Sequence, residues 1–371
     1  MHSQKDCTQL SILSVAYPLF PVTSSSAGGS EQILHALDHG LVQAGHRSIV
    51  IAAKGSRVDG ELIETLAPPA QITDAIRAEA QRVQRNSIEA VLQTTRVDLV
   101  HFHGLDFLAY LPGHKRTPQL ATLHLPLTWY SPGLFENPDL FLNCVSKNQA
   151  GSKTAAERLT VVTNGIELEK FQVCHRKQQY LLWLGRVCPE KGAHVALRTA
   201  HRLKLPLIVA GPIHPFSAHQ AYFKEQVEPL LDDQRCYIGP VGTRRRAELL
   251  ARARSLLVPS LVAETSSLVA MEAIASGTPV VAFRSGALPE VVDHGLTGFI
   301  VESEEDMAKA VLKTGLISSA TCRATAEKRF TASRMCQDYF RLYDLILSSP
   351  SPERLITKRD FGMAIAPHSD L

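Results

Sequence analysis

Glu264 and Glu272 are the two residues whose type and spacing point most directly to chemistry. Seven residues separate them, and a helix is expected to begin between them, at about Leu268. A carboxylate accepts two hydroxyl hydrogen bonds side by side, which suits the vicinal diols of a ribose and a sugar. Ser266 or Ser267 can cap the helix, whose free N–H groups would form a phosphate site. Taken alone, the pair is as compatible with structural roles as with a ligand site. In the structural interpretation, Glu272 caps a neighbouring amide and Glu264 is a solvated loop charge.

A second cluster, Arg186 and Lys191, lies between Gly185 and Gly192 in a loop that follows an expected strand at residues 180–184. A guanidinium forks onto two oxygens and an ammonium supplies a point charge, so the two suit a diphosphate. The Walker pattern GxxxxGK[ST] is absent. Two solvated loop cations are the alternative interpretation.

Short apolar runs alternate with helical patterns along almost the whole chain, which is typical of parallel strands covered on both faces. The strands are expected at residues 10–16, 48–53, 99–103, 119–123, 141–145, 180–184, 207–210, 235–238, 255–259, 280–283 and 298–301, with helices at 30–44 and 75–93 among others. This alternation occurs twice and predicts an α/β fold with two doubly wound, Rossmann-like domains.

The predicted domains are residues 1–168 and 169–333, because the polar, linker-like stretch near 164–178 separates the two alternating patterns. A last helix is expected at 334–348, packed back on the N-terminal domain, and residues 349–371 are expected to form a mobile tail. Ligands of open parallel sheets bind at the carboxyl ends of the strands. Two such sheets facing each other would therefore form a cleft between the domains.

Composition excludes some partners and favours others. The 371 residues carry 39 Lys and Arg against 36 Asp and Glu, a net charge of +3 that does not favour a nucleic-acid partner. No run approaches a membrane span, and the N-terminus lacks the apolar core of a signal peptide, so a cytoplasmic location is expected. The seven cysteines are dispersed without CxxC spacing, which predicts reduced thiols and no zinc framework.

The helix expected at residues 75–93 offers the strongest case for membrane contact. Arg77, Arg82 and Arg85 give it a basic face that could touch anionic lipid. Glu79 and Glu89 interrupt that face, so a solvated helix is the preferred interpretation and peripheral membrane contact is the alternative.

Together, these motifs resemble the family 4 retaining glycosyltransferases, which have the GT-B architecture of two facing Rossmann-like domains. The resemblance runs from about residue 10 to 345. Its matching segments are Ala27-Gly28-Gly29-Ser30-Glu31, Gly45-His46, Thr163-Asn164-Gly165-Ile166, Gly185-Arg186 with Lys191-Gly192, residues 264–281, and residues 286–298. It implies an N-terminal domain on the acceptor side and a C-terminal domain that binds a nucleotide sugar.

The resemblance also implies roles for single residues. Arg186 and Lys191 would neutralise the donor diphosphate, Glu272 would hold the ribose, and Glu264 would contact the donor sugar. His124 matches the family's histidine near the reacting sugar; His101 and His103 are weaker candidates, and a structural role is preferred for His101. The implied catalytic residues are thus His124, Glu264, Arg186 and Lys191, and the implied donor-binding residues are Gly28, Gly29, Asn164, Arg186, Lys191, Glu264, Ser266, Ser267, Leu268, Val269 and Glu272.

One departure concerns the donor sugar. The family commonly has an aromatic-Gly pair after the first glutamate, whereas this chain has Ser266-Ser267. Family membership further implies transfer with retention at the anomeric carbon, in which the leaving phosphate helps to deprotonate a hydroxyl acceptor of unknown identity. No DxD-type metal site stands out, so no cofactor or metal is expected beyond the nucleoside-diphosphate sugar.

Four alternatives stand beside an active transferase. A non-catalytic sugar-nucleotide-binding protein should have lost some of the four charged groups, yet all are present. A GT-B epimerase does not predict this glutamate pair, and a phosphorylase lacks a visible lysine motif for a pyridoxal cofactor. A NAD-linked dehydrogenase fails at the first strand, which no GxGxxG follows.

Overall fold

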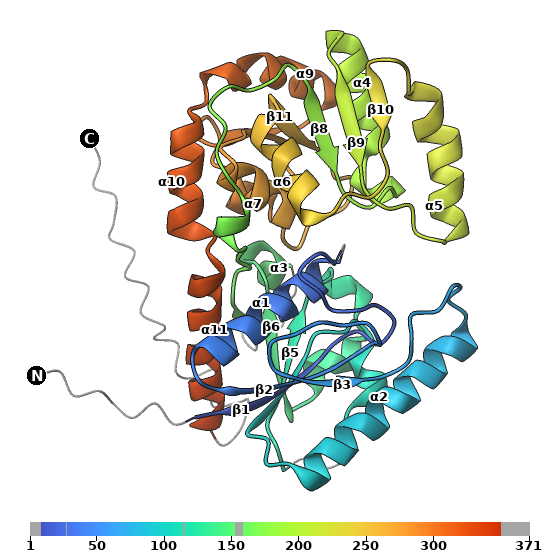
Figure 1. Ribbon diagram of the computed structural model, residues 1–371, viewed down its shortest axis with the longest axis vertical. Helices are drawn as coiled ribbons and strands as arrows, with labels where there is room; N and C mark the ends of the chain where they lie inside the picture. The colour runs from blue at the N-terminus through green and yellow to red at the C-terminus, as the bar shows by residue number, and fades with distance from the viewer. Residues whose placement is uncertain (1–8, 27, 114–115, 153–158, 350–371) are drawn as a thin grey trace, which may run out of the picture.

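The computed structural model describes residues 9–26, 28–113, 116–152 and 159–349, which form two α/β domains stacked one on the other (Figure 1). Every strand pair within the two sheets is parallel. The carboxyl ends of parallel strands meet at one edge of a sheet, so each domain gathers its strand-end loops at one edge.

The N-terminal sheet has seven strands in the order β3-β2-β1-β4-β5-β6-β7. The strands are β1 (Ser11–Val15), β2 (Arg47–Ala52), β3 (Glu61–Glu64), β4 (Leu99–Phe102), β5 (Gln119–Leu123), β6 (Leu140–Cys144) and β7 (Leu159–Val161). Its helices are α1 (Gly29–Gln43), α2 (Asp74–Thr94) and α3 (Lys147–Gly151), with single turns at Phe107–Tyr110, Leu127–Trp129 and Pro132–Glu136.

The C-terminal sheet has six strands in the order β10-β9-β8-β11-β12-β13. They are β8 (Leu181–Leu184), β9 (Leu207–Ala210), β10 (Arg235–Tyr237), β11 (Ser255–Val258), β12 (Val280–Phe283) and β13 (Gly298–Val301). Its helices are α4 (Ala193–Leu203), α5 (Ser217–Tyr222), α6 (Thr243–Arg252), α7 (Leu268–Ala275), α8 (Leu288–Val291), α9 (Glu304–Lys313) and α10 (Ser319–Arg329), and short turns lie at Leu168–Lys170, Pro189–Lys191, Phe223–Val227, Glu228–Leu230 and Thr314–Leu316.

The chain crosses between the domains twice, and the two crossings are hydrogen-bonded to each other. The Ile166 amide donates to the Phe330 carbonyl at 2.7 Å, and the Ala332 amide donates to the Ile166 carbonyl at 2.8 Å. Gly165 allows this approach, because a Cβ atom there would lie 2.4 Å from the Thr331 carbonyl oxygen. The paired crossings form a narrow connection beside the cleft.

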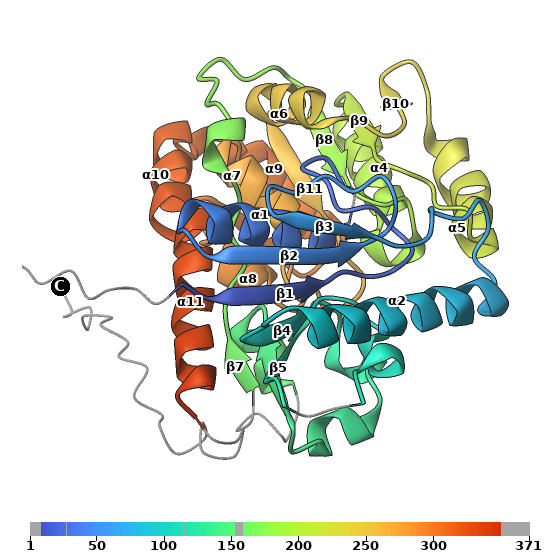
Figure 2. The same cartoon turned by 60° about the horizontal axis from the view of Figure 1, so that its bottom comes forward.

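After the second crossing, α11 (Ala332–Leu347) runs down the side of the N-terminal domain (Figures 1 and 2). Met335 and Tyr339 join the buried core that Leu37 and Leu41 of α1 form. A side chain at Gly40 would meet the Cys336 sulfur at 2.4 Å, so this glycine sets how closely α1 and α11 pack.

All eleven predicted strands are present, with ends within one residue of their predicted bounds. The sequence missed two edge strands, β3 and β7. The tail predicted at 349–371 lies, apart from its first residue, outside the described residues.

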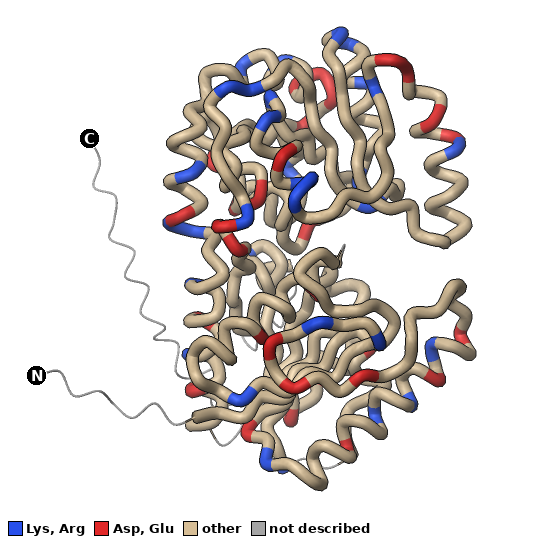
Figure 3. The backbone as a smooth tube through the Cα atoms, viewed as in Figure 1, with Lys and Arg blue, Asp and Glu red and all other residues tan. Residues whose placement is uncertain are grey.

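Charged side chains of both signs are distributed over both domains (Figure 3). Along α2, Arg82 pairs with Glu79 and Arg77 lies 3.7 Å from Asp74. In the described part of the chain, no helix has the length and apolar character needed to cross a membrane.

Candidate active site

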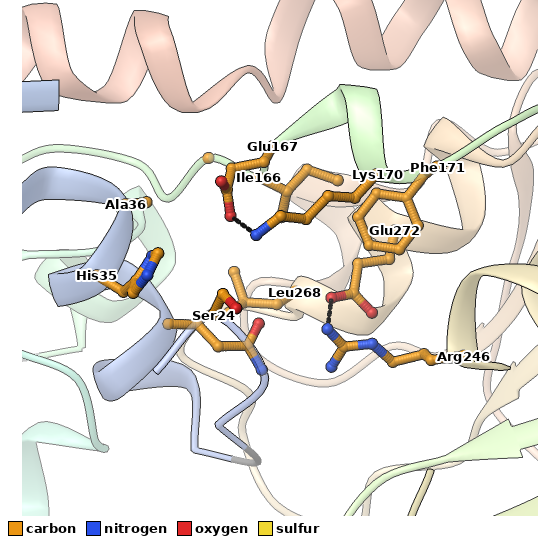
Figure 4. Close-up of a pocket in the computed structure, with 12 residues that line it drawn as sticks. Ser24, His35, Ala36, Ile166, Glu167, Lys170, Phe171, Arg246, Leu268 and Glu272 are labelled. Carbon is orange, nitrogen blue, oxygen red and sulfur yellow. Dashed lines mark hydrogen bonds and ion pairs between the residues drawn. The ribbon is translucent and has the colours of Figure 1, made fainter. Parts of the chain in front are cut away.

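Helix α7 begins at the carboxyl edge of the C-terminal sheet, directly after the loop that follows β11. Glu272, on the second turn, is 3% exposed and forms an ion pair of 3.3 Å with Arg246 of α6 (Figure 4). Burial raises the pKa of Glu272, and the charges of Arg246 and Lys170 partly offset that effect. Glu272 is thus a buried carboxylate near the start of α7 that can still accept hydrogen bonds.

Glu264 lies on the loop before α7 and is linked to the loop after β8. Its Oε1 atom lies 2.5 Å from the Lys191 Nζ atom and also accepts a hydrogen bond from the Ser260 hydroxyl. The Glu264 side chain is 7% exposed and that of Lys191 is 29% exposed. The resemblance assigned Lys191 to the diphosphate and Glu264 to the donor sugar, and in the structure these two groups are in direct contact.

Two glycines hold the loops of Glu264 and Lys191 in place. Gly192 has φ +67° and lies against Pro259, whose carbonyl oxygen would be 2.2 Å from a Cβ atom. Gly286 has φ +55° and lies against the Glu264 backbone, whose carbonyl accepts from the Ala287 amide at 2.7 Å. Only glycine combines a positive φ with such close approach, which explains the motif that begins at Gly286.

Arg186 lies in the loop after β8. It forms no hydrogen bond or ion pair with another described residue, yet its charge is close enough to lower the pKa of Glu31 in part. Burial has the larger effect and raises the pKa of Glu31, which is 6% exposed. A Cβ atom at Gly28 would collide with the Glu31 carboxylate, and Gly29 lies against Leu268. The two glycines therefore make room for a buried glutamate and for the start of α7.

His124 follows β5 and is hydrogen-bonded to a second histidine. Its Nε2 atom lies 3.1 Å from Nδ1 of His103, which is 2% exposed. Burial lowers the pKa of His124 to about 4 and that of His103 well below its usual value, so both rings are neutral at pH 7. The His103 Nε2 atom is buried without a hydrogen-bond partner among the described residues.

His101 belongs to a buried polar network and not to the cleft. Its Nδ1 atom lies 2.8 Å from the Tyr343 hydroxyl, and its Nε2 atom lies 2.7 Å from the Thr122 hydroxyl. Tyr339 and Asn143 complete this network, which joins three strands to α11. The His101 ring also lies beside that of His103, with the centroids 4.0 Å apart and the planes tilted by 41°.

The serines before α7 correct one prediction. Ser267 occupies the N-cap position, but its side chain makes no capping hydrogen bond. The Ser266 hydroxyl is buried and has no partner in the described chain, and the same holds for the Asn164 side-chain oxygen. The backbone at Ser267 (φ −121°, ψ 89°) lies outside the extended region that the capping serine and threonine residues of the other helices adopt. Neither serine hydroxyl therefore caps the helix.

A pocket lies between the crossing segment, α1, α6 and α7 (Figure 4). Its lining includes residues of both domains: Ser24, Gln32, His35, Ala36, Gly165, Ile166, Glu167, Lys170, Phe171, Arg246, Leu268 and Glu272. Sequence reasoning missed His35, Lys170 and Arg246 because their only signal is proximity in space. His124, Arg186, Lys191, Glu264 and the two loop glycines do not line it, so the predicted residues extend along the cleft beyond this pocket.

Direct contacts connect the two domains across the cleft. The Thr265 hydroxyl donates to the His124 carbonyl at 2.8 Å. The Glu290 carboxylate accepts from the Lys147 amide at 3.1 Å and the Asn148 amide at 2.5 Å, at the start of α3. The loops of Glu264 and His124, which are 140 residues apart in sequence (264 minus 124), are thereby brought together.

Two Rossmann-like domains whose strand-end loops meet across a cleft define the GT-B class of proteins. The sequence model "Glycosyltransferase Family 4" matches residues 27–170, and "Glycosyl transferases group 1" matches residues 178–314. The chain belongs to the family 4, group 1 glycosyltransferases. The two matches cover the N-terminal and C-terminal domains in turn.

Curated relatives match parts of the chain. The D-inositol 3-phosphate glycosyltransferase of Mycolicibacterium smegmatis is 31% identical over 231 residues, which are 56% of this chain and 53% of that protein. The enzyme of that name from Corynebacterium efficiens is 35% identical over 131 residues, which are 33% of this chain and 31% of that protein. The chain thus spans between a third and about half of the length of these relatives.

Solved structures share the fold over nearly the whole chain. AviGT4, a glycosyltransferase involved in avilamycin A biosynthesis, is 24% identical with a TM-score of 0.71 over 92% of this chain and 99% of that one. Sucrose-phosphate synthase from Thermosynechococcus elongatus is 17% identical with a TM-score of 0.75 over 91% and 99%. HepE from Anabaena, solved with UDP-glucose, is 17% identical with a TM-score of 0.71 over 91% and 100%.

Proposed function

We propose that this chain transfers a sugar from a nucleoside-diphosphate sugar to a hydroxyl acceptor, with retention at the anomeric carbon. The observation that carries the proposal is the contact between Lys191 and Glu264 beside the start of α7, together with the ion pair between Glu272 of α7 and Arg246 of α6. A family 4 chain that retains these groups in contact has the parts that a sugar-nucleotide site needs.

The diphosphate would bind between Arg186, Lys191 and the first amides of α7. In the free protein Lys191 is balanced by Glu264, and an incoming diphosphate would compete for its ammonium. Arg186 has no partner among the described residues and is free to fork onto phosphate oxygens. The amides of Ser267, Leu268 and Val269 would add donors at the positive end of the helix.

The ribose would bind next to Glu272. The Glu272 carboxylate would accept the two ribose hydroxyls, and the charge of Arg246 favours its ionised form against the larger, opposing effect of burial. Asn164, with its unpartnered side-chain oxygen, lies on the crossing segment near the pocket that Glu272 lines. UDP sugars are the first donors to test, because a structural neighbour was solved with UDP-glucose.

The sugar would lie between Glu264, Ser266 and His124. In the reaction, the bond from the anomeric carbon to the phosphate oxygen breaks and a bond to the acceptor oxygen forms on the same face. The leaving phosphate oxygen takes the acceptor proton. Neutral His124 would hydrogen-bond a sugar hydroxyl, and the two cations would stabilise the charge that develops on the phosphate.

Metal independence is part of the proposal. Arg186 and Lys191 supply two positive charges where other transferases use a divalent ion, so magnesium or manganese should not be needed. Turnover that is lost in a chelator and restored by either ion would contradict this.

The acceptor is proposed only as a class, a hydroxyl compound that binds on the N-terminal side of the cleft. The curated relatives are named for inositol 3-phosphate, so inositol phosphates belong in the first acceptor panel.

The test is a transfer assay with UDP-, GDP- and ADP-sugars, followed by NMR of the anomeric proton in donor and product. Retained configuration is expected, with activity lost in Glu272→Gln and Arg186→Ala. Arg82→Ala is the matched control, because Arg82 is exposed and pairs with Glu79 on the same helix, α2. Inverted product, or unchanged activity in the two site variants, would refute the proposal.

A further inference from the structure

Cys188, Glu190 and His219 form a cluster of metal-ligand side chains beside the donor-binding loop. One ligand atom of each lies within 4.8 Å of the ligand atoms of the other two. Among the described residues, this is the one group of three or more such side chains with that geometry. None of the three has a part in the proposed sugar transfer.

Two different elements bring the cluster together. Cys188 and Glu190 flank Pro189 in the loop after β8, and His219 lies on α5, 31 positions after Cys188 (219 minus 188). The dispersed cysteines predicted no zinc site, since this spacing matches no zinc motif. Only the folding of α5 against the loop makes the three side chains neighbours.

The burial of the three side chains suits a bound ion. Cys188 is 2% exposed, while Glu190 and His219 are partly exposed, so the cluster has a protected side and an open side. The His219 Nδ1 atom is buried and has no hydrogen-bond partner in the described part of the protein. A buried polar atom without a partner is costly, and coordination of a cation is one way to satisfy a ring nitrogen.

We propose that Cys188, Glu190 and His219 bind a zinc-type transition-metal ion. A thiolate, an imidazole and a carboxylate form a ligand set that suits borderline-soft Zn²⁺ and does not suit Mg²⁺. Zinc bonds of about 2.0–2.3 Å at tetrahedral angles separate the ligand atoms by roughly 3.3–3.8 Å. Side-chain rotations that move the ligand atoms by about 1 Å would bring them to these separations. The fourth coordination position would stay open to water.

The charges nearby permit a dication. The thiolate and the carboxylate together neutralise the charge of Zn²⁺, which limits repulsion from the nearby Arg186. Bound zinc would tie α5 to the loop that carries Arg186 and Lys191, and would thereby stiffen that loop.

The first experiment titrates metal-free protein with Zn²⁺ against a chromophoric chelator, in the absence of any sugar nucleotide. One equivalent is expected to bind. Cys188→Ser and His219→Ala should each weaken zinc binding by at least about 10- to 100-fold. Cys236→Ser is the matched control, because Cys236 is an exposed cysteine of the same domain and should bind zinc as the wild type does.

The second experiment keeps the test independent of folding defects. Co²⁺ in the wild-type protein should give thiolate-to-metal charge-transfer absorption that His219→Ala weakens and Cys188→Ser removes, while circular dichroism confirms that both variants are folded. Absence of a one-to-one zinc site, or wild-type affinity in both variants, would overturn the proposal. Sugar transfer can fail or succeed without affecting this result, because zinc binding is measured alone.

Discussion

At the scale of single residues, the sequence motifs did not reveal the contact between His103 and His124. Both rings are neutral, so one nitrogen of the pair donates and the other accepts across 3.1 Å. The bond occupies Nε2 of His124 and leaves its Nδ1 for another partner. His103 is buried behind His124, so it can fix the orientation of that ring without touching the sugar.

We expect His103 to be a positioning residue. His103→Phe preserves a flat ring but removes the hydrogen bond, and should lower kcat about 10- to 100-fold with little change in the donor KM. His103→Gln, which can still hydrogen-bond, should recover part of kcat. Steady-state kinetics would measure both variants.

His194→Phe is the control for that experiment, since His194 is a half-buried histidine of the other domain that bonds Tyr222. A loss of kcat in His103→Gln as large as in His103→Phe would contradict the positioning role. Equal changes in kcat and donor KM would do so as well.

At the scale of elements, the sequence predicted the interiors of the sheets well and their edges poorly. Strands such as β8 and β12 are continuous apolar runs, which are typical of strands buried on both faces. The missed β3 is Glu-Leu-Ile-Glu with its glutamates exposed, and β7 has three residues. Edge strands are short and polar, so nothing in composition separates them from loops.

At the site, too, the sequence revealed local motifs but not the partners that packing brings to them. Arg186, Lys191, Glu264 and Glu272 stand in local motifs that sequence can reveal. Arg246 lies 26 positions before Glu272 (272 minus 246) on another helix, so only packing identifies it as the ion-pair partner. The serines before α7 were expected to cap it, but Ser267 lacks the extended backbone of the capping residues elsewhere in the chain, and its side chain makes no capping hydrogen bond.

His101 on β4, His103 directly after β4 and His124 directly after β5 should make folding sensitive to acid. Burial lowers the pKa of His101, His103 and His124, whereas the unfolded chain titrates near 6.5. Below that pH the unfolded state binds protons that the folded state does not, so stability is lost as pH falls from about 6.5 towards 4. Each histidine contributes a slope of about 1.4 kcal/mol per pH unit to the free energy of unfolding.

Urea denaturation at pH 7 and pH 5 would measure this effect. His101→Asn should be less stable at pH 7, because it disrupts the bonds to Tyr343 and Thr122, but should lose less stability on acidification. The prediction is wrong if the wild-type protein is equally stable at both pH values. It is also wrong if the variant loses as much stability between pH 7 and pH 5 as the wild type does.

At the scale of the whole molecule, closure of the cleft depends on a few polar contacts between the domains. Glu290 of α8 accepts two amide hydrogen bonds from the start of α3, and Thr265 bonds the His124 carbonyl. Hydrogen bonds to a charged group contribute about 1.5–3 kcal/mol each, so the loss of both at Glu290 should favour an open arrangement.

Glu290→Ala is therefore expected to increase the radius of gyration of the free protein and to weaken donor binding several-fold. Small-angle X-ray scattering measures the first change and calorimetry the second. Glu302→Ala, which removes an exposed glutamate of the same domain, should change neither. If Glu290→Ala leaves both quantities at their wild-type values, these contacts do not control closure.

The central claim is that a sugar nucleotide binds where Lys191 meets Glu264 at the start of α7. The most direct measurement is isothermal titration calorimetry of a nucleoside diphosphate and its sugar with wild-type protein, Lys191→Met and the exposed control Lys309→Met. We expect one site per chain, an affinity about 10- to 100-fold weaker in Lys191→Met, and no change in Lys309→Met. Wild-type affinity in a folded Lys191→Met protein, or no binding of any UDP, GDP or ADP ligand to the wild type, would contradict the account.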